Sequence, residues 1–194
     1  MEMAFDAQNE LSDEALLVLY GNGDVAAARA LTLRLTPRML GYATRMLGDA
    51  AEAEDVAQEA MLRLWRVAPE WRQGEARVST WLYRVVSNLC IDRLRRSRGV
   101  ALDADADTAD SAPGAEARLQ AAARVEALET ALRALPERQR QAVVLRHIEG
   151  LANPEIAEVM EISVEAVESL TARGKRALAG QLAGRRDELG YDDG

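Results

Sequence analysis

The sequence is poor in the residues that build covalent frameworks and catalytic or metal sites. Its 194 residues include one Cys and one His. A single thiol excludes a disulfide framework and a thiolate metal cluster, and it suits a reducing compartment. Neither Cys90 nor His147 belongs to a recognisable nucleophile–base motif, and no glycine-rich phosphate loop or metal-ligand spacing occurs. We therefore expect no enzyme activity, no metal, no cofactor and no small-molecule substrate.

The sequence also lacks long apolar runs, and only 4% of its residues are aromatic. It has no stretch of about 18 apolar residues and no basic segment followed by an apolar one at the N-terminus. We therefore expect no membrane span, no export and a cytoplasmic location. Ala, Leu, Arg and Glu dominate the composition, and 48% of the residues are hydrophobic, which favours a packed all-α fold.

The formal net charge of −8 excludes a chain coated in positive charge, but the charge is unevenly distributed. The segment 63–98 holds nine basic and three acidic residues, whereas residues 1–62 hold four basic and eleven acidic ones. Residues 99–117 hold five acidic and no basic residues. A basic block inside an acidic chain indicates an anionic partner at a defined place.

The acidic segment 99–117 also marks a domain boundary. It alternates Asp with small residues, contains a Pro–Gly pair and has little to bury. This composition predicts a flexible linker. We therefore predict a helical domain over 1–98, a linker over 99–117 and a second helical domain over 118–194.

Caps and periodicity predict four helices ahead of the linker. The first three begin at caps formed by Ser12, Asp24 and Asp49, and the third extends over 50–67. The fourth extends over 80–96 and has one broad apolar face, at about 100° per residue. Its opposite face carries Trp81, Arg84, Asn88, Asp92, Arg95 and Arg96.

Half of the eight aromatic residues lie in the basic block. Aromatic rings interleaved with Arg suit single-stranded nucleic acid, because bases stack on the rings while guanidinium groups meet phosphates. The alternative is that the rings fill a core, and their facing favours this for Trp65 and Tyr83. Trp71 and Trp81 are the better candidates for contact with bases.

After the linker, helices are expected over 118–134 and 137–148, followed by the spacing of a helix-turn-helix. Ala157 is small, as required where two helices cross, and Ser163 is placed to cap the second helix. The polar face of that helix would lie in the major groove. The segment 170–186 holds five basic residues and no acidic one.

These runs resemble the conserved regions of bacterial sigma factors. DAAEAEDVAQEAMLRLWR and STWLYRVVSNLCIDRLRR are similar to region two, and LPERQRQAVVLRHIEGLANPEIAEVMEISVEAVESL is similar to region four. With no region-three domain between them, the chain resembles the extracytoplasmic-function sigma factors over residues 12–182. The resemblance implies a factor that binds core RNA polymerase and directs it to promoter DNA in a stress or envelope response. It also implies control by an anti-sigma factor.

The resemblance further implies roles for individual residues. By this resemblance, Asp55, Gln58 and Glu59 would bind the clamp of the largest polymerase subunit. Contacts with the minus-ten element would fall to Trp71, Trp81, Arg84, Asn88, Asp92, Arg95 and Arg96, with a flipped-out base held by the loop 74–79. Contacts with the minus-thirty-five element would fall to Ser169, Arg173, Lys175 and Arg176.

The turn of the helix-turn-helix and the acidic linker each lead to a further expectation. Members of this family often carry Gly in the helix-turn-helix turn, where Glu161 stands here; a left-handed backbone would cost a non-glycine residue about 1 kcal/mol or more. In the linker, a polyanionic strand could occupy a path in polymerase built for nucleic acid. The linker residues that could supply this negative charge are Asp103, Asp105, Asp107 and Asp110.

Two other classes of protein share part of these features. A two-domain transcription regulator, with a helical sensor ahead of a helix-turn-helix, would explain the C-terminal half. Such a regulator does not need the Asp55, Gln58 and Glu59 motif or the Trp- and Arg-rich helix. A pure interaction adaptor is disfavoured because two separate basic surfaces are expected.

Overall fold

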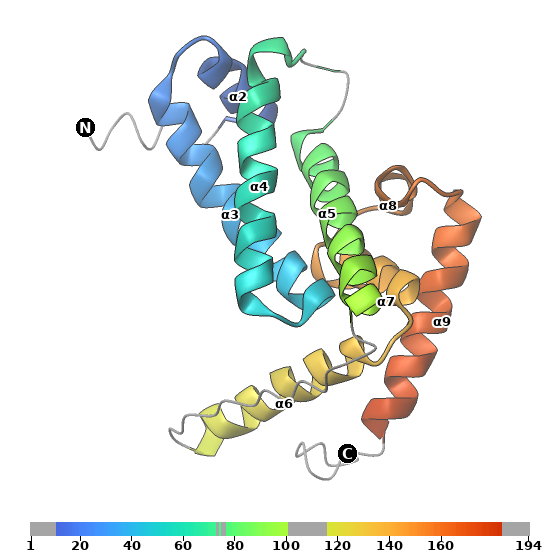
Figure 1. Cartoon of the computed structure of the whole chain (residues 1–194). Helices are drawn as coiled ribbons and strands as arrows, with labels where there is room; N and C mark the ends of the chain where they lie inside the picture. Colours follow the sequence, from blue (N-terminus) through green and yellow to red (C-terminus); the bar gives the residue numbers. More distant parts are fainter. Residues whose placement is uncertain (1–10, 73, 75–76, 101–115, 184–194) are drawn as a thin grey trace.

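The computed structural model describes residues 11–72, 74, 77–100 and 116–183, and within these ranges it contains helices and no strand. The prediction of an all-α fold is confirmed. The helices form an N-terminal group and a C-terminal group that lie side by side (Figure 1). None of the helices in the described ranges combines the length and apolar character of a transmembrane span.

The N-terminal group is a bundle in which α3 contacts α2, α4 and α5. Its elements are α2 (Asp13–Gly21), α3 (Val25–Leu47), α4 (Ala50–Val67), the short 3₁₀ helix η1 (Ala68–Glu70) and α5 (Val78–Val100). The C-terminal group consists of α6 (Glu116–Arg133), α7 (Glu137–Val143), the π-helical turn η2 (Val144–Ile148), α8 (Asn153–Met160) and α9 (Val164–Ala183). The linker aspartates Asp103, Asp105, Asp107 and Asp110 lie outside the described residues.

The predicted caps begin the first three helices. The Ser12 hydroxyl accepts a hydrogen bond from the Ala15 amide at 3.2 Å. The Asp24 carboxylate accepts one from the Ala26 amide at 2.9 Å. The Asp49 carboxylate accepts one from the Glu52 amide, in the first turn of α4, at 2.9 Å. α3 continues as one helix through Pro37.

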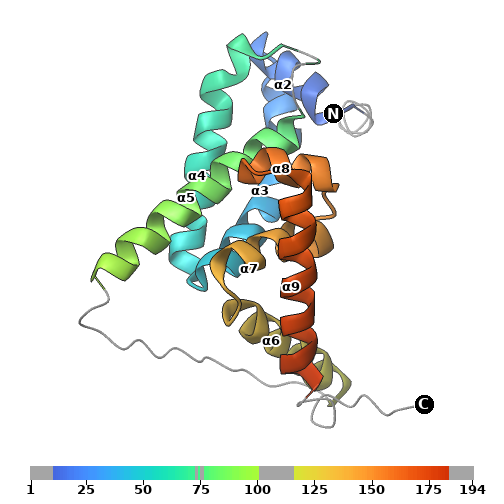
Figure 2. The same cartoon turned by 90° about the vertical axis from the view of Figure 1, so that its right-hand side faces the viewer.

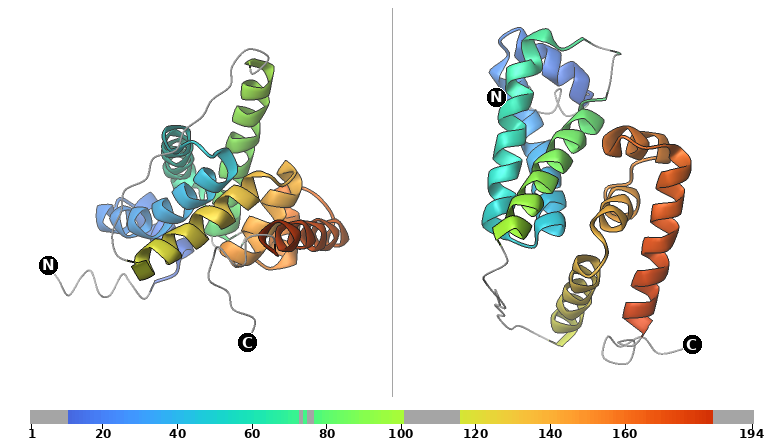
Figure 3. Two further views of the ribbon diagram at one scale, coloured as in Figure 1. Left: turned by 90° about the horizontal axis from the view of Figure 1, so that it is seen from below. Right: turned by 45° about the vertical axis from the view of Figure 1, so that its right-hand side comes forward.

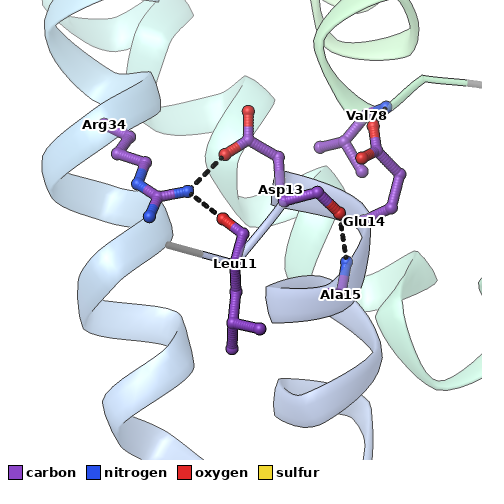
Figure 4. A network of polar contacts seen from close by, with 7 residues as sticks. Leu11, Asp13, Glu14, Ala15, Arg34 and Val78 are labelled. Carbon is purple, nitrogen blue, oxygen red and sulfur yellow. Dashed lines mark hydrogen bonds and ion pairs between the residues drawn. The ribbon is translucent and has the colours of Figure 1, made fainter. Parts of the chain in front are cut away.

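A polar network links the start of α2 to α3 and to the start of α5 (Figure 4). The Arg34 guanidinium donates to the Leu11 carbonyl at 2.7 Å and pairs with the Asp13 carboxylate at 3.2 Å. The Glu14 carboxylate accepts a hydrogen bond from the Val78 amide at 3.0 Å. That contact satisfies one of the amides at the start of α5, and the helix begins two residues ahead of the predicted range 80–96.

The core of the N-terminal bundle is largely apolar, and it contains a buried hydrogen bond between two hydroxyl groups. Tyr42 and Tyr83 are buried edge-to-face, with ring centroids 5.6 Å apart. The Tyr42 hydroxyl is 2.7 Å from the Ser87 hydroxyl, so both buried oxygens are satisfied. Because Tyr83 and Ser87 belong to α5, this contact fixes the rotation of that helix about its axis.

The helix-turn-helix forms as predicted. The Ser163 hydroxyl accepts a hydrogen bond from the Ala166 amide at 3.3 Å, which caps α9. Glu161 ends α8 in the left-handed conformation, with φ of 53°. Gly174 lies where α9 crosses α7, and an added Cβ would stand 2.5 Å from a methyl of Val143. Only glycine therefore permits this approach of the two helices.

The two groups share one continuous core. α5 packs against α8, and α3 contacts α6 and α7. The view from the side shows α8 lying across α5, with α9 running down from α8 toward α6 (Figure 2). Seen from below and at 45°, α6 lies under the N-terminal bundle (Figure 3). The sequence predicts two helical domains, and their helical periodicity does not show that they pack together.

Candidate polymerase and nucleic-acid interfaces

The residues predicted to dock on polymerase lie on the outer face of α4. Asp55 and Gln58 are exposed, and Glu59 is partly exposed. The Arg63 guanidinium donates to the Glu59 carboxylate at 2.9 Å, and this hydrogen bond lowers the pKa of Glu59. Arg93 of α5 lies 4.0 Å from the Asp55 carboxylate. Both carboxylates of this acidic face, Asp55 and Glu59, therefore lie next to arginines.

A groove between α3 and α4 adjoins this acidic face. Its volume is about 430 Å³, and Gln58 lines it together with the apolar side chains of Leu40, Leu62 and Trp65. Leu62 is exposed, and Leu33 on α3 is more exposed still. An apolar groove with an acidic rim has the chemistry of a protein-docking surface.

The residues predicted to meet the minus-ten element share one side of α5. Arg84, Asn88, Asp92, Arg95 and Arg96 are all exposed. The opposite side buries Leu82, Val86 and Cys90 in the core. Burial also raises the pKa of the Cys90 thiol to about 12, so it stays protonated. The predicted division of α5 into two faces is therefore the observed one.

The two tryptophans expected to meet bases pack on each other. The rings of Trp71 and Trp81 lie edge-to-face, with centroids 6.0 Å apart, and both are half-buried against the core. The neighbouring loop 74–79 falls partly outside the described residues; within it, Gly74 has a positive φ of 96°. The pair therefore leaves part of each ring accessible beside the start of α5.

The residues predicted to meet the minus-thirty-five element lie on the solvent side of α9. Ser169, Arg173, Lys175 and Arg176 are all exposed. The Arg173 guanidinium donates to the Ser169 hydroxyl at 3.1 Å, which fixes its direction along the helix. Partial burial and the nearby charges of Lys175 and Arg146 lower the pKa of His147, so the basic surface draws its charge from Arg and Lys.

A contact that the sequence reasoning missed joins the two groups of helices. Arg84 forms an ion pair with Glu161, and Arg77 pairs with Glu155 at 2.9 Å. The Tyr83 hydroxyl donates to the Glu149 carboxylate. Carboxylates of the C-terminal group thus lie against the basic side of α5.

One sequence signal could have revealed this contact. Residues 148–172 include six Glu and no Lys or Arg. An acidic stretch of this length is complementary to the basic block 63–98.

Similarity to known proteins covers both groups of helices. Residues 31–100 match the family described as sigma-70 region 2, and residues 125–178 match sigma-70, region 4. The RNA polymerase sigma-H factor of Pseudomonas aeruginosa is 33% identical over 86% of this chain and 91% of its own length. The ECF RNA polymerase sigma factor SigM of Mycobacterium tuberculosis is 34% identical over 91% of this chain and 88% of its own length. Among solved structures, CnrH in complex with the cytosolic domain of CnrY is 26% identical, with a TM-score of 0.64 over 89% of this chain and 97% of that one.

Proposed function

Because the chain belongs to the extracytoplasmic-function family of RNA polymerase sigma factors, we propose that it works through three surfaces on three helices. The outer face of α4 docks on core polymerase, the polar side of α5 meets the minus-ten element, and the solvent side of α9 meets the minus-thirty-five element. The protein binds core polymerase and directs promoter-specific initiation, as a sigma factor does. The observation that carries the assignment is the sorting of one acidic and two basic residue sets onto three separate helix faces.

The α4 surface suits a protein partner. Asp55, Gln58 and Glu59 supply charge and hydrogen-bond acceptors, and the adjoining groove supplies apolar area. Burial of the apolar groove would provide affinity, and the acidic rim would set the orientation of the partner. A basic or mixed helical surface on polymerase is the matching chemistry.

The α5 surface suits a separated DNA strand. Arg84, Arg95 and Arg96 can hold phosphates, and Asn88 can both donate to and accept from base edges. The Trp71 and Trp81 rings offer a platform on which an extruded base can stack. Extrusion costs a few kcal/mol, and stacking in a prepared pocket offsets it.

The α9 surface suits an intact duplex. A helix of the described length enters the major groove, where Arg173 and Arg176 can reach phosphates or guanine edges and Ser169 can contact either. Lys175 adds a further phosphate contact. The buried side of α9 is held on α7 by the close approach at Gly174.

Further assignments follow from this role. We place the protein in the cytoplasm because its polymerase partner acts there, and we regard it as an initiation factor without enzyme activity of its own. A protein regulator is part of this proposal, because the similar CnrH was solved in complex with the cytosolic domain of CnrY. The family resemblance makes that regulator an anti-sigma factor and the response one to stress or envelope damage.

Run-off transcription tests the proposal. Purified core polymerase is combined with the protein and a library of promoter fragments, and transcripts are mapped. Specific initiation is expected only when the protein is present. The variant Asp55→Ala/Gln58→Ala should reduce initiation about tenfold at limiting protein and recover it at high protein concentration, because docking is weakened. Glu70→Ala, which removes one acidic charge from an exposed position outside α4, should initiate normally.

A further inference from the structure

Glu168 places a negative charge on the side of α9 that is proposed to enter the major groove. It is exposed, and it precedes the exposed Ala172 and Arg176 by four and eight residues, so the three side chains share one side of the helix. Val167 and Gly174 are buried on the other side. DNA phosphates on both walls of the groove repel a carboxylate in this place. A favourable contact with the DNA is needed to offset that repulsion.

The helix itself gives Glu168 little stabilisation. Acidic residues favour the first turn of a helix, where Glu165 stands, but Glu168 is the fifth residue of α9. Hydrogen bonds from its own backbone amide and from the Ser163 hydroxyl engage the Glu165 carboxylate and lower its pKa. The positions three and four residues away from Glu168 hold no Lys or Arg, and one of them is Glu165. Glu168 therefore has no ion-pair partner of opposite charge at helical spacing.

A contact from α8 orients the Glu168 side chain. α9 begins beside α8, and the two helices pack on each other (Figure 2). The side-chain nitrogen of Asn153, the first residue of α8, lies 3.4 Å from Oε1 of Glu168. The two oxygens of a carboxylate can together accept about four hydrogen bonds. The contact with Asn153 therefore directs the carboxylate and leaves acceptor capacity for a group in the groove.

The base edge that suits a carboxylate in the major groove is that of cytosine. Its N4 amino group donates a hydrogen bond, and Glu or Asp accepts it. Guanine presents the two acceptors N7 and O6, and thymine presents the acceptor O4 beside a methyl group. Adenine presents a donor next to an acceptor, a pattern that an amide matches and a carboxylate does not. A carboxylate at this place therefore favours cytosine over the other three bases.

We propose that Glu168 is a specificity-determining residue of α9, which accepts a hydrogen bond from the N4 amino group of one cytosine in the minus-thirty-five element. This inference rests on the proposed role of α9. The N-terminal residues of a recognition helix contact base edges, and Glu168 lies in that part of α9, ahead of Arg173 and Arg176. The carboxylate lowers the general attraction to DNA and in return disfavours the wrong bases.

The variant Glu168→Gln tests the inference because it keeps the shape of the side chain and changes its hydrogen-bonding pattern. A glutamine both donates and accepts, so it matches N7 and N6 of adenine. The matched control is Glu158→Gln, which removes the same charge from an exposed position on α8. Wild type and both variants are assembled with core polymerase. Each receives promoter fragments in which every position of the minus-thirty-five element carries each of the four bases in turn, and run-off transcripts are counted.

The wild type should prefer cytosine at one position by about tenfold over the other bases. Glu168→Gln should lose this preference, favour adenine at the same position and keep the wild-type preferences elsewhere. Glu158→Gln should keep the wild-type preference at every position.

Unchanged base preferences in Glu168→Gln, even with more transcript from every fragment, would overturn the inference, because the carboxylate would then act through its charge alone. A wild-type profile with no preference for cytosine at any position would overturn it as well. Failure of the proposed function is a separate result, since the wild-type protein would then give no specific transcript from any fragment.

Discussion

At the scale of single residues, several charged side chains on the proposed surfaces are oriented by a hydrogen bond or an ion pair with a neighbouring residue. Arg173 is oriented by Ser169, Glu59 by Arg63, and Arg84 by Glu161. Arg173 and Arg84, which are assigned to DNA, would each have to exchange this partner for a phosphate. The affinity of a DNA-binding side chain therefore depends on the contact that it must first give up.

The contribution of one phosphate contact can be measured on α9. Arg176 is exposed, and its guanidinium donates along its own helix to the Ala172 carbonyl at 3.3 Å. Arg176→Ala should weaken binding to a minus-thirty-five duplex and reduce the slope of log affinity against log salt by about one unit, because one fewer counterion is released. Fluorescence anisotropy over a salt series gives the slope.

The control for this prediction is Arg133→Ala. It removes the same charge from α6, where the Arg133 side chain lies close to Gly48 of the N-terminal bundle. Its slope should equal that of the wild type. Equal slopes for all three proteins would remove Arg176 from the phosphate contacts.

At the scale of elements, the helices and their caps could be predicted because the signals are local. Ser12, Asp24, Asp49 and Ser163 each cap a helix at the expected place. Glu161 shows a limit of local reasoning. The sequence indicates a turn there, and the backbone is left-handed without the glycine that usually accepts this conformation. Its ion pair with Arg84 belongs to tertiary structure, which local pattern does not encode.

The crossing of α7 and α9 gives a prediction at this scale. Gly174→Ala would place a methyl 2.5 Å from Val143 and 3.3 Å from the Gln139 carbonyl, which forces the two helices apart. We expect a loss of about 1–3 kcal/mol in the free energy of unfolding. Urea denaturation followed by circular dichroism measures it.

Gly180 on the same helix provides the matched control. An added Cβ there meets no atom within 4 Å. Gly180→Ala should stabilise the protein by up to about 1 kcal/mol, because alanine favours the helical state. Equal stability of the two variants would show that α9 does not depend on the close approach at Gly174.

At the scale of the whole molecule, the distribution of charge predicted which helix faces carry basic side chains but not how the two groups of helices pack. The basic block 63–98 became the polar side of α5 and the adjoining tryptophan pair, as the sequence indicated. The packing of α8 on α5 could not be predicted from helical periodicity, because it joins segments about 80 residues apart. Complementary charge was the available signal, and it lay in the six glutamates of 148–172.

The three proposed surfaces differ in how far the C-terminal group of helices covers them. The acidic face of α4 is left exposed by the C-terminal group, whereas Arg84 on the basic side of α5 is paired with Glu161. A net charge of −8 also disfavours promoter binding by the protein alone.

The central claim is that α5 and α9 contact separate elements of one promoter when the protein is bound to polymerase. A hydroxyl-radical-generating chelate attached at Ser97→Cys on α5, or at Ala172→Cys on α9, measures this directly, because both positions are exposed. In open complexes with core polymerase, the account predicts cleavage at two sites about 25 base pairs apart, roughly two and a half turns of duplex. Cleavage by both chelates at the same site, or by neither, would contradict it.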